Sequence, residues 1–211
     1  MTAITGQAVP CGYPGPDLRR PEGNGRAEKM TSRRVMSRAE GVDGAVRHFV
    51  RNGGLDMEEL AAELAVSRAT LYRVAGSRDA LLGEALWAMG RWVLDRCRAE
   101  RTAAGADGVI EVSRNYARKL ATAEPIRRFL GAEPQTAARV LLTPAATVHR
   151  EAVSAQHAVF LEAGLPPGPC LRHRATLYVG LMESVLYGEQ LGGDAIAFEV
   201  AEPALRALIT R

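Results

Sequence analysis

The sequence predicts an all-α protein made of a small N-terminal three-helix unit and a larger helical domain. Of its 211 residues, 47% are hydrophobic but only 5% are aromatic. Ala, Leu, Val and Arg dominate, and of these Ala, Leu and Arg are strong helix formers, whereas Phe, Tyr, Ile and Trp, which sheets favour, are few. Apolar residues also recur at helical spacing between Gly and Pro breaks. These observations together favour helices throughout.

The composition leaves little support for an enzyme. The chain contains no GxSxG, HExxH, CxxC or GxGxxG signature, and of its 27 basic residues only Lys29 and Lys119 are lysines, neither in a phosphate-binding loop. Cys11, Cys97 and Cys170 are too far apart for a disulfide framework or a metal pair. We therefore expect no catalytic residue, no cofactor and no metal. A net charge of +3 permits nucleic-acid binding without requiring it.

Residues 1–36 mix Pro and Gly so densely that we expect a disordered tail. Between Met1 and Arg38, seven basic residues stand against three acids. This segment is either a basic arm that reaches DNA, an ordinary solvated tail, or a translated leader upstream of a start near Met30 or Met36. No apolar run of signal or membrane-span length occurs, so we expect a cytoplasmic protein without membrane contact.

Three short helices follow the tail. The first runs from Ser37 to about Arg51 and stops at Asn52-Gly53-Gly54. Asp56, with Glu59 three residues later, caps the second, and Ser67 caps the third. The linker Ala-Val-Ser between the last two is so short that they must cross steeply, as in a helix-turn-helix.

The third helix, from Ser67 to Val74, is about 12 Å long, which is comparable to the width of a DNA major groove. Leu71 and Val74 point inward, and no acid occurs between Ser67 and Arg78. The helix is therefore either a DNA-reading face or a basic solvated surface. The residues turned toward solvent are Arg68, Ala69, Thr70, Tyr72 and Arg73.

The segment Asp56 to Leu82, DMEELAAELAVSRATLYRVAGSRDALL, resembles the helix-turn-helix of TetR-type transcriptional regulators. Leu60-Ala61, Val66-Ser67 and Thr70-Leu71-Tyr72 follow the order typical of that family. Three positions depart from it: Ala65 replaces a usual turn glycine, Ala75 a usual Phe, and Arg78 a usual Lys. Further on, ESVLYGEQ at Glu183 to Gln190 more loosely resembles TetR-type regulators associated with degradation of acyl-homoserine lactone signals.

The resemblance implies a DNA-binding domain over residues 37–80 and an effector-binding and dimerisation domain over residues 81–211. Arg68 and Thr70 would read base edges, while Tyr72, Arg73 and Arg78 would hold phosphates. The full predicted DNA-binding set is Ser67, Arg68, Ala69, Thr70, Tyr72, Arg73 and Arg78.

The C-terminal domain is predicted to begin with a long helix that Ser77 opens and that continues to about Cys97, linking the two halves. Gly and Pro residues separate the helices that follow, the last of which we expect Pro203 to interrupt. Their predicted ranges are Val109 to Ala123, Ile126 to Ala132, Thr136 to Leu142, Pro144 to about Ala163, Cys170 to Leu191 and Asp194 to Ile209.

The resemblance also implies that the two long helices dock on a second copy as a four-helix bundle. An internal core seam would give the same apolar pattern. The predicted stripes are Ala145, Val148, Ala152, Ala155, Val159 and Ala163 on one helix, and Leu171, Ala175, Tyr178, Met182 and Val185 on the other.

An effector would be recognised by aromatic and polar side chains inside these helices, although an aromatic residue at helical spacing is more often core. His149 and His157 are more typical of a solvated or interface pair than of a metal site. Arg127, His149, His157 and Glu183 are candidate orienting groups. The predicted ligand-binding set is Trp87, Trp92, Tyr116, Phe129, Tyr178, Met182, Glu183 and Tyr187.

The sequence thus predicts a homodimeric regulator, more often a repressor, that binds a double-stranded DNA operator and responds to an unidentified small-molecule effector. One alternative is a small-molecule binding protein of the same fold that lacks operator recognition, motivated by Ala65 and Ala75. A helical enzyme is a third, for which the sequence offers no nucleophile, base or metal.

Overall fold

The computed structural model describes residues 36–210, which form ten α-helices and one short 3-10 helix. The all-α prediction is confirmed for this part of the chain. The predictions for the basic tail concern residues that, apart from Met36, lie outside the described range. No helix within residues 36–210 is long and apolar enough to cross a membrane.

The first three helices are α1 (Arg38–Asn52), α2 (Met57–Glu63) and α3 (Arg68–Ala75). α2 and α3 begin at the predicted caps Asp56 and Ser67, and α1 begins directly after Ser37; all three side chains accept hydrogen bonds from backbone amides of the first helical turn. α1 ends at Gly53, which takes the left-handed conformation (φ +69°) as expected for its C-terminal stop. The predicted helix-turn-helix is therefore present.

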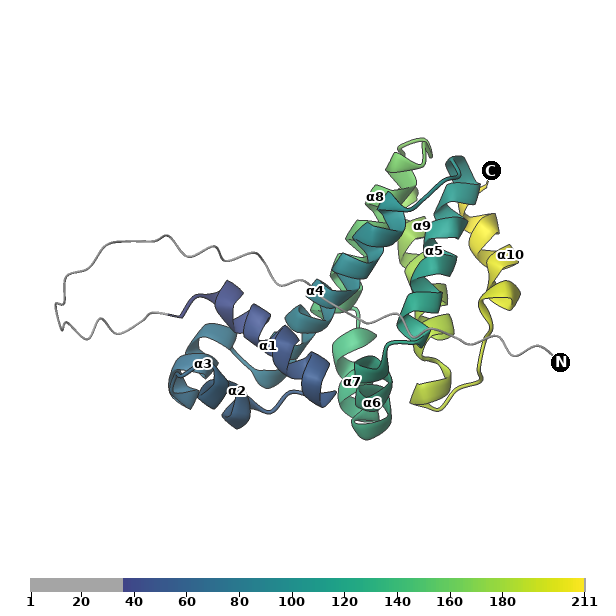
Figure 1. Ribbon diagram of the computed structural model, residues 1–211. Coiled ribbons are helices and arrows are strands. Elements are labelled where there is room, and N and C mark those ends of the chain that lie inside the picture. Colours follow the sequence, from purple (N-terminus) through teal and green to yellow (C-terminus); the bar gives the residue numbers. More distant parts are fainter. Residues whose placement is uncertain (1–35, 211) are drawn as a thin grey trace. The chain divides into compact units, whose positions relative to one another are not determined.

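The long helix α4 (Arg78–Ala99) connects α1–α3 to the rest of the fold, as Figure 1 shows. It packs against α1 and α3 near its start, and against α5 and α8 elsewhere. The remaining elements are α5 (Gly105–Ala121), α6 (Glu124–Ala132), α7 (Pro134–Leu141), α8 (Thr147–Glu162), α9 (Leu171–Tyr187), η1 (Glu189–Leu191) and α10 (Phe198–Ile209).

The C-terminal core lies between α5, α8, α9 and α10. Phe160 and Tyr178 meet edge to face there, with ring centroids 5.3 Å apart, and the Tyr178 hydroxyl lies 2.8 Å from the Ser113 hydroxyl. This core corrects the predicted dimer stripes. Val159, Ala175 and Tyr178 are fully buried inside one chain, so this part of the α8–α9 pattern is the internal seam and cannot face a second copy.

Helix boundaries differ from the prediction by four residues at the start of α5, which begins at Gly105, at the end of α9 and at the start of α10. α9 ends at Tyr187, and Glu189–Leu191 forms a separate 3-10 turn after Gly188. α10 begins only at Phe198 and continues through Pro203 without a break. A proline removes one backbone hydrogen bond, and burial of Leu205 beyond it keeps the helix on the core.

Candidate DNA-binding face and effector site

The face of α3 that points to solvent is the candidate DNA-binding surface. Leu71 and Ala75 are buried against the other helices, whereas the exposed residues between Ser67 and Arg73 are polar, basic or small. The Ser67 hydroxyl accepts from the Thr70 amide at 3.1 Å and lies 2.9 Å from the Thr70 hydroxyl. The exposed residues are Ser67, Arg68, Ala69, Tyr72 and Arg73, with Thr70 partly buried.

Arg68, at the N-terminal end of this face, lies 3.3 Å from the Glu58 carboxylate of α2. Both side chains are more than half exposed, so the pair is screened by water and contributes little. Arg68 can therefore leave Glu58 at small cost and turn toward another anion.

The turn before α3 shows how the chain adapts to the missing glycine. Ala65 has φ +52°, the only positive φ of a non-glycine residue among residues 36–210. The amide of Val66 still donates to the Ala61 carbonyl at 3.0 Å, which closes the turn. Ala65 thus accepts a strained conformation so that α2 and α3 can cross as in a helix-turn-helix.

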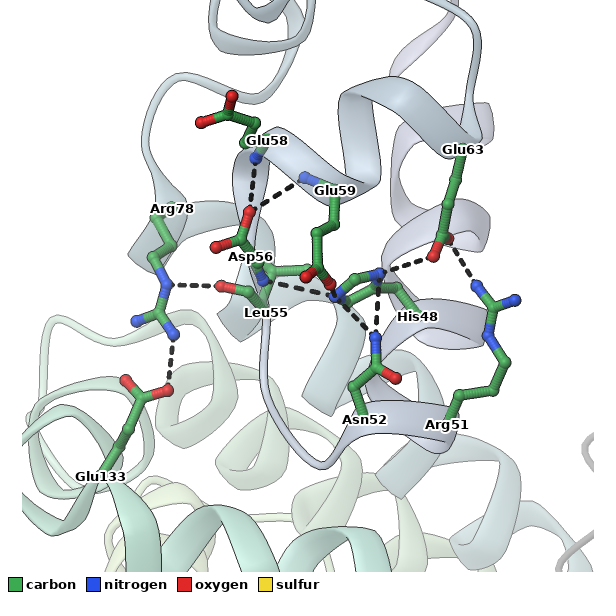
Figure 2. Close-up of polar contacts among 10 residues, drawn as sticks. All are labelled: His48, Arg51, Asn52, Leu55, Asp56, Glu58, Glu59, Glu63, Arg78 and Glu133. Atoms are coloured by element: carbon green, nitrogen blue, oxygen red, sulfur yellow. Dashed lines mark hydrogen bonds and ion pairs between the residues drawn. The ribbon is translucent and has the colours of Figure 1, made fainter.

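A polar network inside the N-terminal unit centres on His48, which is almost fully buried (Figure 2). Its Nδ1 lies 3.0 Å from the Glu63 carboxylate, and its Nε2 lies 3.0 Å from the Asn52 amide and 3.4 Å from the backbone nitrogen of Asp56. An imidazole with the proton on Nδ1 satisfies all these partners at once. His48 therefore ties α1 to both ends of α2.

Arg78, the first residue of α4, points into the protein. Its Nε donates to the Leu55 carbonyl at 2.7 Å and its Nη2 to the Glu133 carboxylate at 2.6 Å, as Figure 2 shows. About 30% of each charged side chain is exposed. In this position the guanidinium is occupied by protein groups, although the sequence pattern placed it among the phosphate contacts.

A second polar group lies among α4, α5, α8 and α9. His149 Nδ1 lies 2.8 Å from the Glu183 carboxylate, and both side chains are about 15% exposed. Desolvation raises the pKa of Glu183, against the opposing effect of the hydrogen bond with His149. Burial also raises the pKa of Tyr187 and of Tyr116, so both phenols stay protonated and can donate hydrogen bonds.

Three observations bring these tyrosines into the same region. Tyr187 follows Glu183 by one turn of α9 and interacts electrostatically with it and with Tyr116. The Tyr116 hydroxyl lies 3.0 Å from the place that a Cβ would occupy at Gly90 of α4. We call His149, Glu183, Tyr116 and Tyr187 the C-terminal polar group.

Other predicted ligand-binding residues lie elsewhere. Phe129 is fully buried against Phe49 of α1, with ring centroids 5.5 Å apart, so it belongs to the contact between α1 and α6. Tyr178 and Met182 belong to the C-terminal core. On α4, Trp87 is partly exposed, and Trp92 carries the Arg96 guanidinium 5.4 Å from its ring centroid.

The remaining observations concern Arg127, a candidate orienting group, and two buried polar residues that the sequence analysis did not single out. Arg127 is 63% exposed and pairs with Glu124 on its own helix. Sequence reasoning missed Gln156, which is buried on α8 with an amide nitrogen that has no hydrogen-bond partner in the described structure. It also missed His48. The available signal in both cases was a polar residue inside an apolar stripe.

The fold defines a helix-turn-helix unit joined by one long helix to a larger helical domain. Residues 104–210 match a family model described as a Tetracyclin repressor-like C-terminal domain. The chain belongs to the TetR family of transcriptional regulators.

A solved structure supports the same fold. It is described as the R. erythropolis transcriptional repressor QsdR from the TetR family, and it superimposes with a TM-score of 0.74 at 23% identity, covering 82% of this chain and 93% of the other. No curated protein sequence matches the chain significantly. The looser resemblance to regulators of acyl-homoserine lactone degradation stays a prediction.

Proposed function

We propose that this protein is a DNA-binding repressor that a small-molecule effector releases from its operator. The observation that carries the proposal is the exposed face of α3, where Arg68 and Arg73 flank Thr70 and Tyr72 while Leu71 anchors the helix. Such a helix fits the major groove with its N-terminus toward the bases. The proposed place of action is the cytoplasm.

Within this proposal, Arg68 and Thr70 read base edges, and Ser67 and Ala69 allow close approach at the helix N-terminus. Tyr72 and Arg73 hold phosphates. The geometry of α2 and α3 supports this assignment, because the turn at Ala65 keeps the required crossing.

Fluorescence anisotropy with duplexes from the DNA that flanks the gene tests the proposal. Arg68→Ala is expected to cost about 1–3 kcal/mol per site and relax the sequence preference, whereas Arg73→Ala weakens all duplexes alike and lowers the salt slope by about one per subunit. Arg127→Ala removes an exposed arginine from α6 and serves as the matched control. A protein that binds a small molecule but no duplex would instead be a binding module without operator recognition.

The C-terminal polar group supports a chemical class for the effector. The group contains two phenols, a carboxyl and an imidazole but no Lys or Arg, and the imidazole already faces the Glu183 carboxylate, so the group offers no permanent positive charge to a carboxylate or phosphate. The unpaired amide of Gln156 lies two turns of α8 beyond His149, about 10 Å along the helix. We therefore propose an uncharged, largely apolar effector with hydrogen-bonding groups.

Tyr187→Phe tests this part of the proposal, because it removes one hydroxyl and keeps the ring. In a screen of uncharged amphiphiles and of their carboxylate analogues, release of the duplex by the uncharged set alone is expected. Tyr187→Phe should weaken release by about 5- to 10-fold, the loss of one hydrogen bond. Release by the carboxylates alone would contradict the proposed class.

We also propose that the protein acts as a homodimer, since two short recognition helices give useful specificity only together. Leu161 of α8 and Leu177 of α9 are 42% and 60% exposed, which leaves large apolar side chains in water in a single chain. Gly180 also has open space beside it, so another helix can approach closely there. We place the second copy on this outer face of α8 and α9.

A further inference from the structure

The start of α4 is held to the α6–α7 region by two ion pairs of opposite polarity. Arg78 donates to Glu133, between α6 and α7, at 2.6 Å. The next residue, Asp79, accepts from Arg139 of α7, also at 2.6 Å. Adjacent residues at the end of the recognition unit therefore reach the same part of the C-terminal domain.

Arg78 also holds the recognition unit itself. Its Nε donates to the Leu55 carbonyl, directly before Asp56, which caps α2. The backbone amide of Asp56 lies against His48, whose ring ties α1 to α2. One guanidinium thus connects the α1–α2 loop with Glu133 (Figure 2).

Glu133 lies at the junction of two helices that also contact other parts of the fold. It ends α6 and precedes α7, with non-helical angles of φ −132° and ψ 56°. Both α6 and α7 contact η1, which follows the end of α9 that carries Glu183 and Tyr187. Glu133 is thus connected to the proposed effector site on one side and to α2 on the other.

We infer that Arg78 is a positioning residue for operator binding that acts through Glu133, and that Asp79 and Arg139 support the same orientation. The inference rests on the proposed function. We propose this positioning role in place of the phosphate contact that the resemblance implies for Arg78. The guanidinium donates to Leu55 and Glu133 and is therefore already directed into the protein. The pairs fix the angle at which α2 and α3 are presented.

Two substitutions that change the net charge in opposite directions test this inference. Glu133→Gln raises the net charge and Arg139→Gln lowers it, yet both break a link between α4 and the α6–α7 region. Both variants are expected to weaken binding to a duplex selected by the wild type from a random library, about 2- to 5-fold per subunit, with an unchanged salt slope. Glu124→Gln, on α6 but paired only within its helix, is the matched control.

Arg78→Lys separates positioning from phosphate binding. A lysine keeps the charge, so a phosphate contact would survive, but one ammonium lacks the fork that reaches both the carbonyl and the carboxylate. We expect this variant to lose affinity as Glu133→Gln does. Retained affinity in Arg78→Lys, or tighter binding by Glu133→Gln alongside weaker binding by Arg139→Gln, would overturn the inference.

A measurement without DNA keeps the inference separate from the proposed function. Spin labels at Ala62→Cys and at the exposed Cys170, in a Cys11→Ser background diluted with unlabelled protein, report the distance between the recognition unit and the C-terminal domain. Glu133→Gln and Arg139→Gln should broaden or shift this distance distribution, and Glu124→Gln should not. If the distance distribution broadens but the protein binds no duplex, only the proposed function is contradicted. If the distances are unchanged, the positioning role is wrong.

Discussion

At the scale of single residues, Ala65 holds a backbone conformation that lowers the stability of the fold. Its φ of +52° lies in the left-handed region, which costs an L-residue with a Cβ about 1–2 kcal/mol. Ala65→Gly should raise the free energy of unfolding by about 0.5–1 kcal/mol, since the greater freedom of glycine in the unfolded chain offsets part of the gain. Urea denaturation measures this change.

The control for Ala65→Gly is Ala62→Gly, three residues earlier on the exposed side of α2. There the backbone is helical, so glycine should lower the stability by about 1 kcal/mol. If both substitutions lowered stability equally, the backbone at Ala65 would not be strained.

The raised pKa of Glu183 predicts how the free energy of unfolding changes with pH. Its pKa is raised above the ordinary 4.5, chiefly by desolvation, so the folded state holds a proton that the unfolded state loses. This contribution to stability is present below the ordinary pKa and is lost as the pH rises through the raised value. The difference in unfolding free energy between wild type and Glu183→Gln should therefore fall across that window.

Chemical denaturation from pH 4 upward, in steps of about half a pH unit around the ordinary carboxyl pKa, follows that difference. His149 and Tyr187, which face Glu183, are retained in both proteins. Glu151→Gln, at an exposed position of α8, controls for the loss of one negative charge. A difference that grows with pH would mean that the His149 contact outweighs desolvation.

At the scale of elements, the contact between α1 and α6 is unusually close at Gly53. A Cβ built on Gly53 would lie 2.9 Å from the Cβ of Arg128, and the Phe49–Phe129 pair packs beside it. Gly53→Ala should cost about 1–2 kcal/mol for the positive φ and a further 1–3 kcal/mol for the overlap. Thermal and urea unfolding measure the sum.

Gly192 separates these two costs. It lies in the same left-handed region (φ +90°, ψ 12°), but nothing lies within 4 Å of its Cβ position. Gly192→Ala should therefore show the backbone cost alone. Equal losses in the two variants would mean that α6 moves away from α1 without resistance.

The sequence predicted elements much better than it predicted contacts. Local signals such as the Ser67 cap and the Gly53 stop placed the helices because cap and stop act within a few residues. The contact of Arg78 with Glu133 could not be predicted, because Glu133 lies 55 residues further along the chain. The face of α9 was misjudged at Tyr178 because an apolar stripe fits an internal seam and an external interface equally well.

At the scale of the whole molecule, the outer face of α8 and α9 predicts self-association. Leu177→Glu places a charge where the proposed second copy would bury an apolar side chain, and Leu177 is 60% exposed and is not part of the buried core cluster. Sedimentation should show a shift from dimer to monomer with the helix content unchanged. Val200→Glu, at the most exposed apolar position of α10, is the control and should stay dimeric; a dimeric Leu177→Glu would place the interface elsewhere.

The last prediction concerns the coupling between effector and operator, which α4 makes possible because it touches both halves of the protein. Its first residues reach the recognition unit, and its middle carries Trp87 and Trp92, the two tryptophans of the chain, near Gly90 and the Tyr116 hydroxyl. An effector can weaken operator binding only by the factor by which it prefers one arrangement of these helices to the other. A coupling free energy of about 1–3 kcal/mol corresponds to roughly 5- to 150-fold.

Because linkage is reciprocal, the operator must weaken effector binding by that same factor. Tryptophan emission, titrated with a compound that releases the duplex, should give a lower affinity for the protein–DNA complex than for the DNA-free protein, in the ratio that anisotropy gives for DNA. Glu133→Gln should shrink both ratios together, since it loosens the link between the two sites. Equal affinity of the compound for protein with and without DNA would mean that it displaces the duplex by competing for the face of α3, and the route through α4 would be wrong.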